Sequence, residues 1–198
     1  NNNSLHSLLQ TAEKAALALG ELKEDISITL YEKETINIHP TIYLPSAVEA
    51  DKKIGVMKIA YDAAKSYHSE ITQVSVGYGD KEQNILIANT DGLYTEDKRV
   101  RTRLFINAVA SANGENQTGT EGPGRRAGIE MFKYIDPEYY GRQAARSAHT
   151  MLHAKNCPAG KMTVAIDNGI GGVIFHEACG HSLEATSVAK GNSVFTGK

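Results

Sequence analysis

The sequence has little cysteine, no excess of one charge and no long apolar run. Two cysteines in 198 residues are too few for a disulfide framework, which favours a reducing, cytoplasmic compartment. With 21 basic and 23 acidic side chains, the formal net charge is −2, so no basic field is present to attract nucleic acid. No apolar stretch approaches the roughly 18 residues of a membrane-spanning helix. We therefore expect neither nucleic acid nor a membrane as a partner.

What the sequence does contain is typical of a folded protein. Hydrophobic residues make up 41% of the chain, and the length suits one good core or two small ones. The chain does not begin with Met and carries no basic-then-apolar signal segment. It stops abruptly after a strongly patterned segment, "GNSVFTGK". We expect it to be a piece of a longer chain.

Helical periodicity marks three segments before residue 158. Leucines and alanines recur at helical spacing after Ser4, which can act as N-cap, and Gly20 can end this helix. A second helix is predicted from Asp51. Its predicted core-facing residues are Ile54, Met57, Ala60, Tyr61, Ala64 and His68. A third helix is predicted over 137–157, opened by Pro137.

Between the second and third helices the pattern is that of strands. Alternation is clear from Val100 to Ala108, with arginines on the opposite, solvated face, and Asp91-Gly92 predicts a tight turn between two strands. Further strands are predicted at 26–31 and 161–166, and residues 113–128 are predicted to form a long polar turn or mobile hairpin tip. Helices and strands in separate runs predict an α+β fold, with helices packed on a mainly antiparallel sheet.

The chain is predicted to divide into two domains. Residues 1–158 form an N-terminal α/β domain, which we expect to lack its true N-terminus, and residues 159–198 begin a second domain. The second carries a glycine turn at 169–172 that opens a fourth helix. That turn resembles a dinucleotide loop, but Ile174 stands where the fingerprint requires its third glycine, so close packing of helix on strand is favoured.

Two other groups of side chains have alternative interpretations. Arg125-Arg126 lies beside glycines and can grip a phosphate or a carboxylate, although a flexible surface loop is favoured. His149, His153 and Cys157 sit at i, i+4 and i+8, so a regular helix places three zinc-binding side chains on one face. Against a metal site, no acidic residue is adjacent, and Pro158 marks the helix end.

The strongest chemical candidate is "FHEACGHSLEA", residues 175–185. In a regular helix, His176 and His181, five apart, point about 140° away from each other. One π-type turn, with i to i+5 bonding, brings both imidazoles to one side. Gly180 lowers the barrier to this distortion, and such strain tends to accompany function. The alternative is an ordinary amphipathic helix with two surface histidines.

Three other residues of this segment contribute to the chemistry. Glu177 follows a ligand, so its carboxylate can reach a water that zinc activates and take its proton as a peptide carbonyl is attacked. Glu184, three after His181, can orient that imidazole, or it is an exposed helix carboxylate. Cys179 can be a soft ligand, but a buried filler is favoured.

Residues 158–198 closely resemble the TldD/PmbA family of metallopeptidases. The match is specific because strand, glycine turn, metal motif and tail come in order. The matching residues are His176, Glu177, His181, Leu183, Glu184, Ser193, Val194, Phe195 and Gly197. Upstream, "NTDG" and "GPGRRAGIEMF" resemble the family's preceding domain more loosely.

The resemblance implies a zinc-dependent peptidase that hydrolyses unfolded or flexible peptides. It implies Zn²⁺ held by His176 and His181, Glu177 as general base, and a third ligand, a cysteine, outside this chain. It also implies a longer chain with a β-rich C-terminal catalytic domain, and a dimer, either with a PmbA-type partner subunit or with a second copy. Two alternatives stay open: a non-catalytic subunit that binds peptide or acts as a scaffold, and an amidase-like hydrolase with the same metal chemistry.

Overall fold

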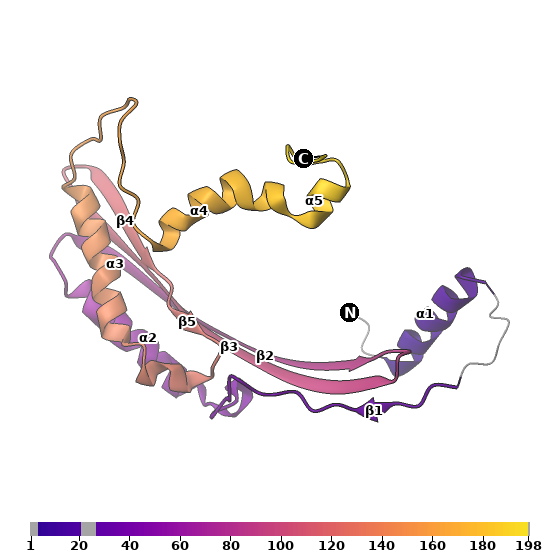
Figure 1. The fold of residues 1–198 in the computed structure, drawn as a ribbon. Coiled ribbons are helices and arrows are strands. Elements are labelled where there is room, and N and C mark those ends of the chain that lie inside the picture. The colour runs from indigo at the N-terminus through magenta and orange to yellow at the C-terminus, as the bar shows by residue number, and fades with distance from the viewer. Residues whose placement is uncertain (1–3, 21–26, 198) are drawn as a thin grey trace. The chain divides into compact units, whose positions relative to one another are not determined.

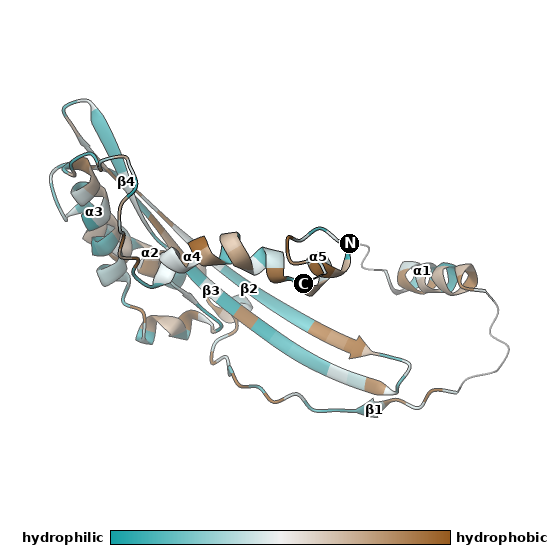
Figure 2. Cartoon of the chain, turned by 45° about the horizontal axis from the view of Figure 1, so that its top comes forward, coloured by the Kyte–Doolittle hydropathy of each residue, from teal (hydrophilic) through white to brown (hydrophobic). Residues whose placement is uncertain are grey.

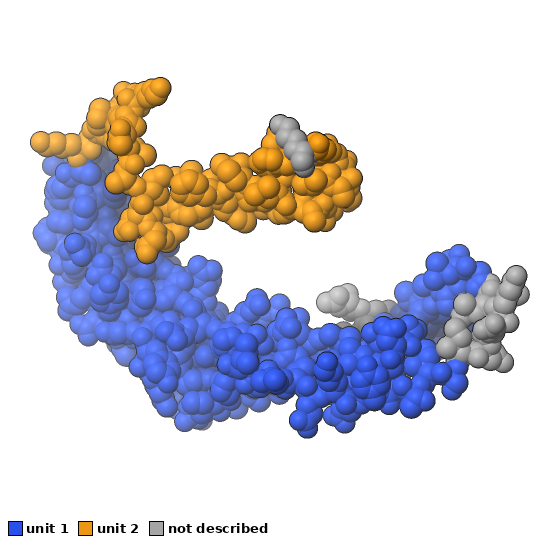
Figure 3. Space-filling view, viewed as in Figure 1, with its two compact units in different colours: residues 1–154 blue, residues 155–198 orange. Residues whose placement is uncertain are grey.

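The computed structural model describes residues 4–20 and 27–197, and the chain forms two compact units (Figure 1). The first unit is Asn1–Ala154 and the second is Lys155–Lys198 (Figure 3). Each unit is described by itself below.

The first unit is built on a long antiparallel hairpin of β2 (Ile71–Ala88) and β3 (Leu93–Ala112). Strands β4 (Glu115–Glu121) and β5 (Gly124–Arg125) pair antiparallel with β3, and the short β1 (Tyr31–Glu32) pairs with it in parallel. The five strands form one mainly antiparallel sheet. Together with the helices below, this confirms the α+β prediction.

The turn between β2 and β3 confirms the predicted role of Asp91-Gly92. Asn89 begins the turn, and its side-chain oxygen accepts hydrogen bonds from the backbone N–H groups of Asp91 and Leu93, at 3.1 and 3.0 Å. Gly92 has φ 89°, a left-handed conformation that favours glycine. The turn therefore fixes the hairpin register through its own side chains.

The described residues of this unit form three α-helices: α1 (Leu5–Ala18), α2 (Ala50–Lys65) and α3 (Pro137–Leu152). Short 3₁₀ turns lie at η1 (Pro45–Ala47) and η2 (Ile129–Lys133). Ser4 caps α1 as predicted, accepting a hydrogen bond from Ser7 N. The second helix begins before the predicted Asp51, with Glu49 at its N-cap. Each of these helices is too short or too polar, within the described residues, to cross a bilayer.

The core lies where α2 and α3 pack on each other and on β2, β3 and β4 (Figure 1). Alternate β3 side chains from Val100 to Ala110 are buried and the arginines between them are exposed, as the alternation predicts. Leu104 and Ile106 are fully buried, and each such burial contributes about 1.5–3 kcal/mol. The helices contribute mainly alanines: Ala60, Ala64, Ala144, Ala145 and Ala148. Of the residues predicted to face the core from the second helix, Ile54, Tyr61 and His68 are instead exposed.

Small residues let the layers approach closely. A Cβ on Gly141 of α3 would collide with the carbonyl oxygen of Ala60 on α2. A Cβ on Gly119 of β4 would collide with the carbonyl oxygen of Ala144 on α3. Residues 115–121, part of the predicted polar turn over 113–128, thus form strand β4, and Gly119 lets α3 lie against it. Only Asn113-Gly114, with φ values of 53° and 82°, makes the turn itself.

The second unit is a series of short helical segments. They are η3 (Gly169–Gly171), α4 (Gly172–Phe175), the π-helical η4 (His176–Gly180), the 3₁₀ turn η5 (His181–Leu183) and α5 (Ala185–Ala189). Apolar residues along α4, brown in Figure 2, are exposed: 46% for Val173, 57% for Ile174 and 62% for Phe175. No residue described in this unit is fully buried.

Two predicted strands and the end of one predicted helix are wrong. Residues 161–166 are exposed and irregular, because the described part of the second unit offers no neighbouring strand to pair with. Of the strand at 26–31, Ile26 lies outside the described residues, and pairing begins only at Tyr31. Helix α3 ends at Leu152 instead of residue 157, and residues 153–157 are all exposed, so no buried face extends the helix beyond that point.

Candidate metal centre

The helix that carries the histidine motif widens at the motif. His176–Gly180 forms a π turn between α4 and η5, and the N–H of His181 donates to the carbonyl oxygen of His176. This is the i to i+5 bond of a π-helix. The distortion that the five-residue spacing requires is therefore present.

The widened turn brings three potential ligands together. The rings of His176 and His181 have centroids 4.5 Å apart, and Glu177 Oε2 lies 3.6 Å from His181 Nε2. One ligand atom from each of the three residues lies within 4.8 Å of the other two. Zinc bonds of about 2.0–2.2 Å at tetrahedral angles place donor atoms about 3.4 Å apart. Because all three side chains are exposed, they are free to close that gap.

Glu184 contacts the far side of the His181 ring. Its Oε1 lies 2.7 Å from Nδ1, so Nδ1–H donates to the carboxylate and Nε2 keeps its lone pair toward Glu177. The hydrogen bond and charge of Glu184, with a further contribution from Glu177, raise the pKa of His181. The Glu184 side chain is also 55% exposed, so its orienting role stays a prediction.

Gly180 contributes space rather than backbone freedom. Its φ of −58° and ψ of −53° are ordinary helical values that any residue adopts. A Cβ there would lie 3.2 Å from His176 Nδ1, a tight contact with the ring. The prediction that Gly180 eases the distortion thus has a different physical basis: the missing Cβ leaves room for the imidazole.

The donor set fits a zinc ion in part. Two imidazoles and a carboxylate are ligands that Zn²⁺ accepts, and Nε2 of His181 is available. A catalytic zinc normally has three protein ligands, so with Glu177 reserved as a base one more ligand is required. Cys179, predicted as a buried filler, is exposed.

The other sequence candidates have mixed outcomes. The glycine turn at 169–172 does not follow a strand, because 161–166 is irregular, so the dinucleotide context is absent from these residues. Arg126 lies 3.8 Å from the Asp97 carboxylate through Nη2, and the Arg125 guanidinium lies 5.5 Å from the Tyr134 ring centroid. Both arginines therefore contact groups of this chain.

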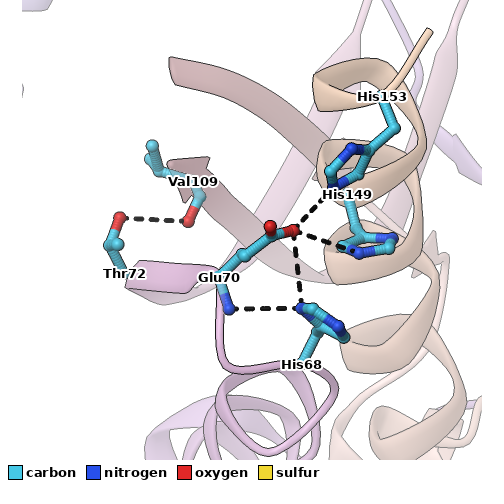
Figure 4. A network of polar contacts seen from close by, with 6 residues as sticks. All are labelled: His68, Glu70, Thr72, Val109, His149 and His153. Carbon is cyan, nitrogen blue, oxygen red and sulfur yellow. Dashed lines mark hydrogen bonds and ion pairs between the residues drawn. The ribbon is translucent and has the colours of Figure 1, made fainter. Parts of the chain in front are cut away.

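The structure brings His149 and His153 together but leaves Cys157 apart. Cys157 is exposed beyond the end of α3. In its place the two histidines meet Glu70 and His68 (Figure 4). Sequence reasoning placed His68 in the core and gave Glu70 no role, and the available signal was the His-x-Glu spacing just after α2.

Comparison with known families identifies the chain. Residues 43–152 match the model of the PmbA/TldA metallopeptidase central domain, and residues 159–198 match that of the C-terminal domain. Together with the relatives below, these matches show that the chain belongs to the TldD/PmbA metallopeptidase family.

Curated relatives carry metalloprotease names. A metalloprotease TldD homologue from Haemophilus influenzae is 31% identical over 98% of this chain and 42% of its own length. A metalloprotease from Methanocaldococcus jannaschii is 32% identical over 98% of this chain and 43% of its own length. The chain thus spans about two fifths of the length of these relatives.

Solved structures share the fold. A candidate modulator of DNA gyrase from Bacteroides thetaiotaomicron matches with a TM-score of 0.74 at 17% identity, over 100% of this chain and 46% of that one. A second, from Thermotoga maritima, matches with a TM-score of 0.58 at 24% identity, over 75% of this chain and 33% of that one.

Proposed function

We propose that this chain carries the zinc-binding helix of a metallopeptidase that hydrolyses unfolded or flexible peptides. His176 and His181 bind the ion and Glu177 is the general base. The observation that supports this most is the π turn, because it places both rings on one side of the helix, with the Glu177 carboxylate beside His181. A surface helix with two unrelated histidines has no need of the distortion.

Each residue has a separate task in the proposed reaction. Zn²⁺, when bound, supplies Lewis acidity that lowers the pKa of water and polarises the peptide carbonyl. Glu177 takes the proton from the attacking water and returns it to the leaving amine. Glu184 holds His181 in the tautomer that leaves Nε2 free for the ion.

The remaining parts of the site follow from the family resemblance. We propose that the third protein ligand is a cysteine outside these 198 residues. We also propose that the active assembly is a dimer, with a PmbA-type partner subunit or with a second copy. The metalloprotease names of the relatives support this peptidase class.

The experiment is a Glu177→Gln substitution in the complete gene product. We expect cleavage of unstructured peptides to fall by roughly 10²–10⁴-fold, the usual contribution of a general base, while the metal content is unchanged. The matched control is Glu138→Gln, an exposed acid-to-amide change on α3. Full activity of the Glu177→Gln variant would show that Glu177 is not the general base. Peptide binding without cleavage in the unsubstituted protein would favour a scaffolding subunit.

A further inference from the structure

A second histidine cluster lies in the first unit, where three segments meet (Figure 4). His68 lies in the connection after α2, and Glu70 immediately precedes β2. His149 occupies the last turn of α3, and His153 is its C-cap residue. The motif helix of the second unit contributes none of these side chains.

The three imidazoles converge on a single carboxylate oxygen. Glu70 Oε2 lies 2.7 Å from His153 Nε2, 3.2 Å from His149 Nε2 and 3.5 Å from His68 Nδ1. The ring centroids of His68 and His149 are 4.2 Å apart, and those of His149 and His153 are 4.8 Å apart. One ligand atom from each of His68, Glu70 and His149 lies within 4.8 Å of the other two, and donor atoms of a tetrahedral zinc site lie about 3.4 Å apart, so these three require only small movements to surround an ion. His153 is outside this group of three and approaches it through its contact with Glu70.

His68 approaches the carboxylate through a nitrogen that also accepts a backbone hydrogen bond. Its Nδ1 accepts the backbone N–H of Glu70 at 3.2 Å, so in this arrangement Nδ1 is the unprotonated nitrogen. The same nitrogen lies 3.5 Å from Oε2 of Glu70, a separation close to that of two donor atoms on one zinc ion. Ligation requires the lone pair of Nδ1 to exchange the backbone N–H for the ion.

We propose that His68, Glu70, His149 and His153 form a second metal site that binds Zn²⁺ or a similar divalent transition metal. Three imidazoles and one carboxylate select zinc-like ions over Ca²⁺ or Mg²⁺, which prefer oxygen ligands. Four protein ligands make a closed, structural site with no position for a reacting water. The side chains of Glu70 and His149 are 24% and 27% exposed and those of His68 and His153 are 43% and 52% exposed, so the site is open to entry of an ion.

An ion at this site links segments that are distant in the sequence. It joins the α2–β2 connection to the last turn of α3, and His153 directly precedes Ala154, where the first unit ends. Metal binding therefore fixes the helix end from which the chain leaves toward the motif. The consequence is a gain in stability of the first unit that does not require peptide cleavage.

The test removes the motif histidines so that the second site is measured alone. In the complete gene product carrying His176→Ala and His181→Ala, we expect one Zn²⁺ per chain by elemental analysis, and Co²⁺ to give the strong d–d absorption of tetrahedral coordination. Zinc at about 100 times its Kd should raise the thermal unfolding midpoint by roughly 5–10 °C.

Further variants in the same background locate the ion. Adding His149→Ala and His153→Ala should weaken zinc binding by more than about 100-fold, since loss of one outer partner alone costs about 10–100-fold. The control is His6→Ala with His39→Ala, which removes two exposed imidazoles elsewhere. If the double variant does not fold, Glu70→Gln replaces it, because this substitution keeps the side-chain shape. Glu70→Gln should weaken zinc binding at least 10-fold.

Two results overturn the proposal. If the protein without the motif histidines retains no Zn²⁺ and gives no Co²⁺ absorption, the cluster is only a set of ion pairs. If the ion persists after the His149 and His153 substitutions, it lies elsewhere. Neither result tests the site formed by His176 and His181. That site would be ruled out separately, if the metal content stayed unchanged when both histidines are removed.

Discussion

His176 and His181 are five residues apart, yet their rings meet edge to face with centroids 4.5 Å apart. The backbone achieves this with one hydrogen bond from His181 N–H to His176 O. A regular helix at this spacing turns the two rings about 140° apart. The proposed zinc chemistry depends on this single turn, and the space beside the turn is as important as its hydrogen bond.

Gly180→Ala should weaken zinc binding by roughly 10-fold, because the new Cβ would lie 3.2 Å from His176 Nδ1 and push the ring out of position. The measurement is zinc affinity by calorimetry. Gly172→Ala is the matched control, since a Cβ on this α4 glycine meets nothing within 4 Å. Equal affinities of the two variants would show that the missing Cβ at Gly180 has no role.

Glu184→Gln should lower the pKa of His181, because the carboxylate at Nδ1 now raises it. The raised pKa favours the charged imidazole in the folded state, so this contribution to stability is present at low pH and is lost as pH rises through the folded pKa. Proton NMR titration of the metal-free protein measures the shift. The same variant should weaken zinc binding about 10–100-fold; an unchanged His181 titration would contradict the orienting role.

Glu130→Gln should lower the free energy of unfolding by about 1–3 kcal/mol. Burial raises the pKa of Glu130, but the backbone N–H groups of Ile42, Gly128 and Tyr43 donate to its carboxylate and together lower it. Loss of the charge weakens three hydrogen bonds: two tie residues 42–43 to η2, and the third, from Gly128, lies at the start of η2. Urea unfolding followed by circular dichroism measures the change.

The contribution of Glu130 to stability depends on pH. Because the folded pKa of Glu130 lies below its ordinary value of 4.5, its contribution is present above that pH and is lost as pH falls through the folded pKa. The Glu130→Gln variant should therefore lose less stability on acidification. Glu138→Gln, whose Arg142 pair is exposed, should change stability by less than about 0.5 kcal/mol. An equal effect of both substitutions would contradict the assignment.

Gly141→Ala should destabilise the first unit by about 1–3 kcal/mol, because the added Cβ collides with the Ala60 carbonyl oxygen and forces α2 and α3 apart. Gly55→Ala on α2 meets nothing within 4 Å and should stabilise by about 0.5–1 kcal/mol through helix propensity. Thermal unfolding of the two variants compares them directly. Stabilisation by both would mean that the two helices are not in close contact.

Local patterns predicted the parts of the fold that depend on local chemistry. The alternation from Val100 to Ala108 predicted the buried face of β3, and the His176–His181 spacing showed that a shared ion requires a π turn, which the helix contains. Residues 161–166 have strand-like composition but no described partner strand, so propensity alone misled. Strand β4 was missed because Gly119 is needed for the close contact between β4 and α3, two segments that are not adjacent in the sequence.

The same reason explains the second histidine cluster. The sequence showed His149 and His153 on one helix face, but their partner Glu70 lies 83 residues before His153. Only the packing of α2 and α3 brings the carboxylate to the imidazoles. Cys157 has the helical spacing of a third ligand, but it lies apart from the two histidines because α3 ends at Leu152.

The central claim is that His176 and His181 share one ion, and anomalous diffraction at the zinc edge tests it most directly. In crystals of the zinc-loaded complete gene product, we predict a peak about 2.0–2.1 Å from one nitrogen of each ring, with the Glu177 carboxylate nearby. The two rings on opposite sides of an unwidened helix, with no peak between them, would contradict the account.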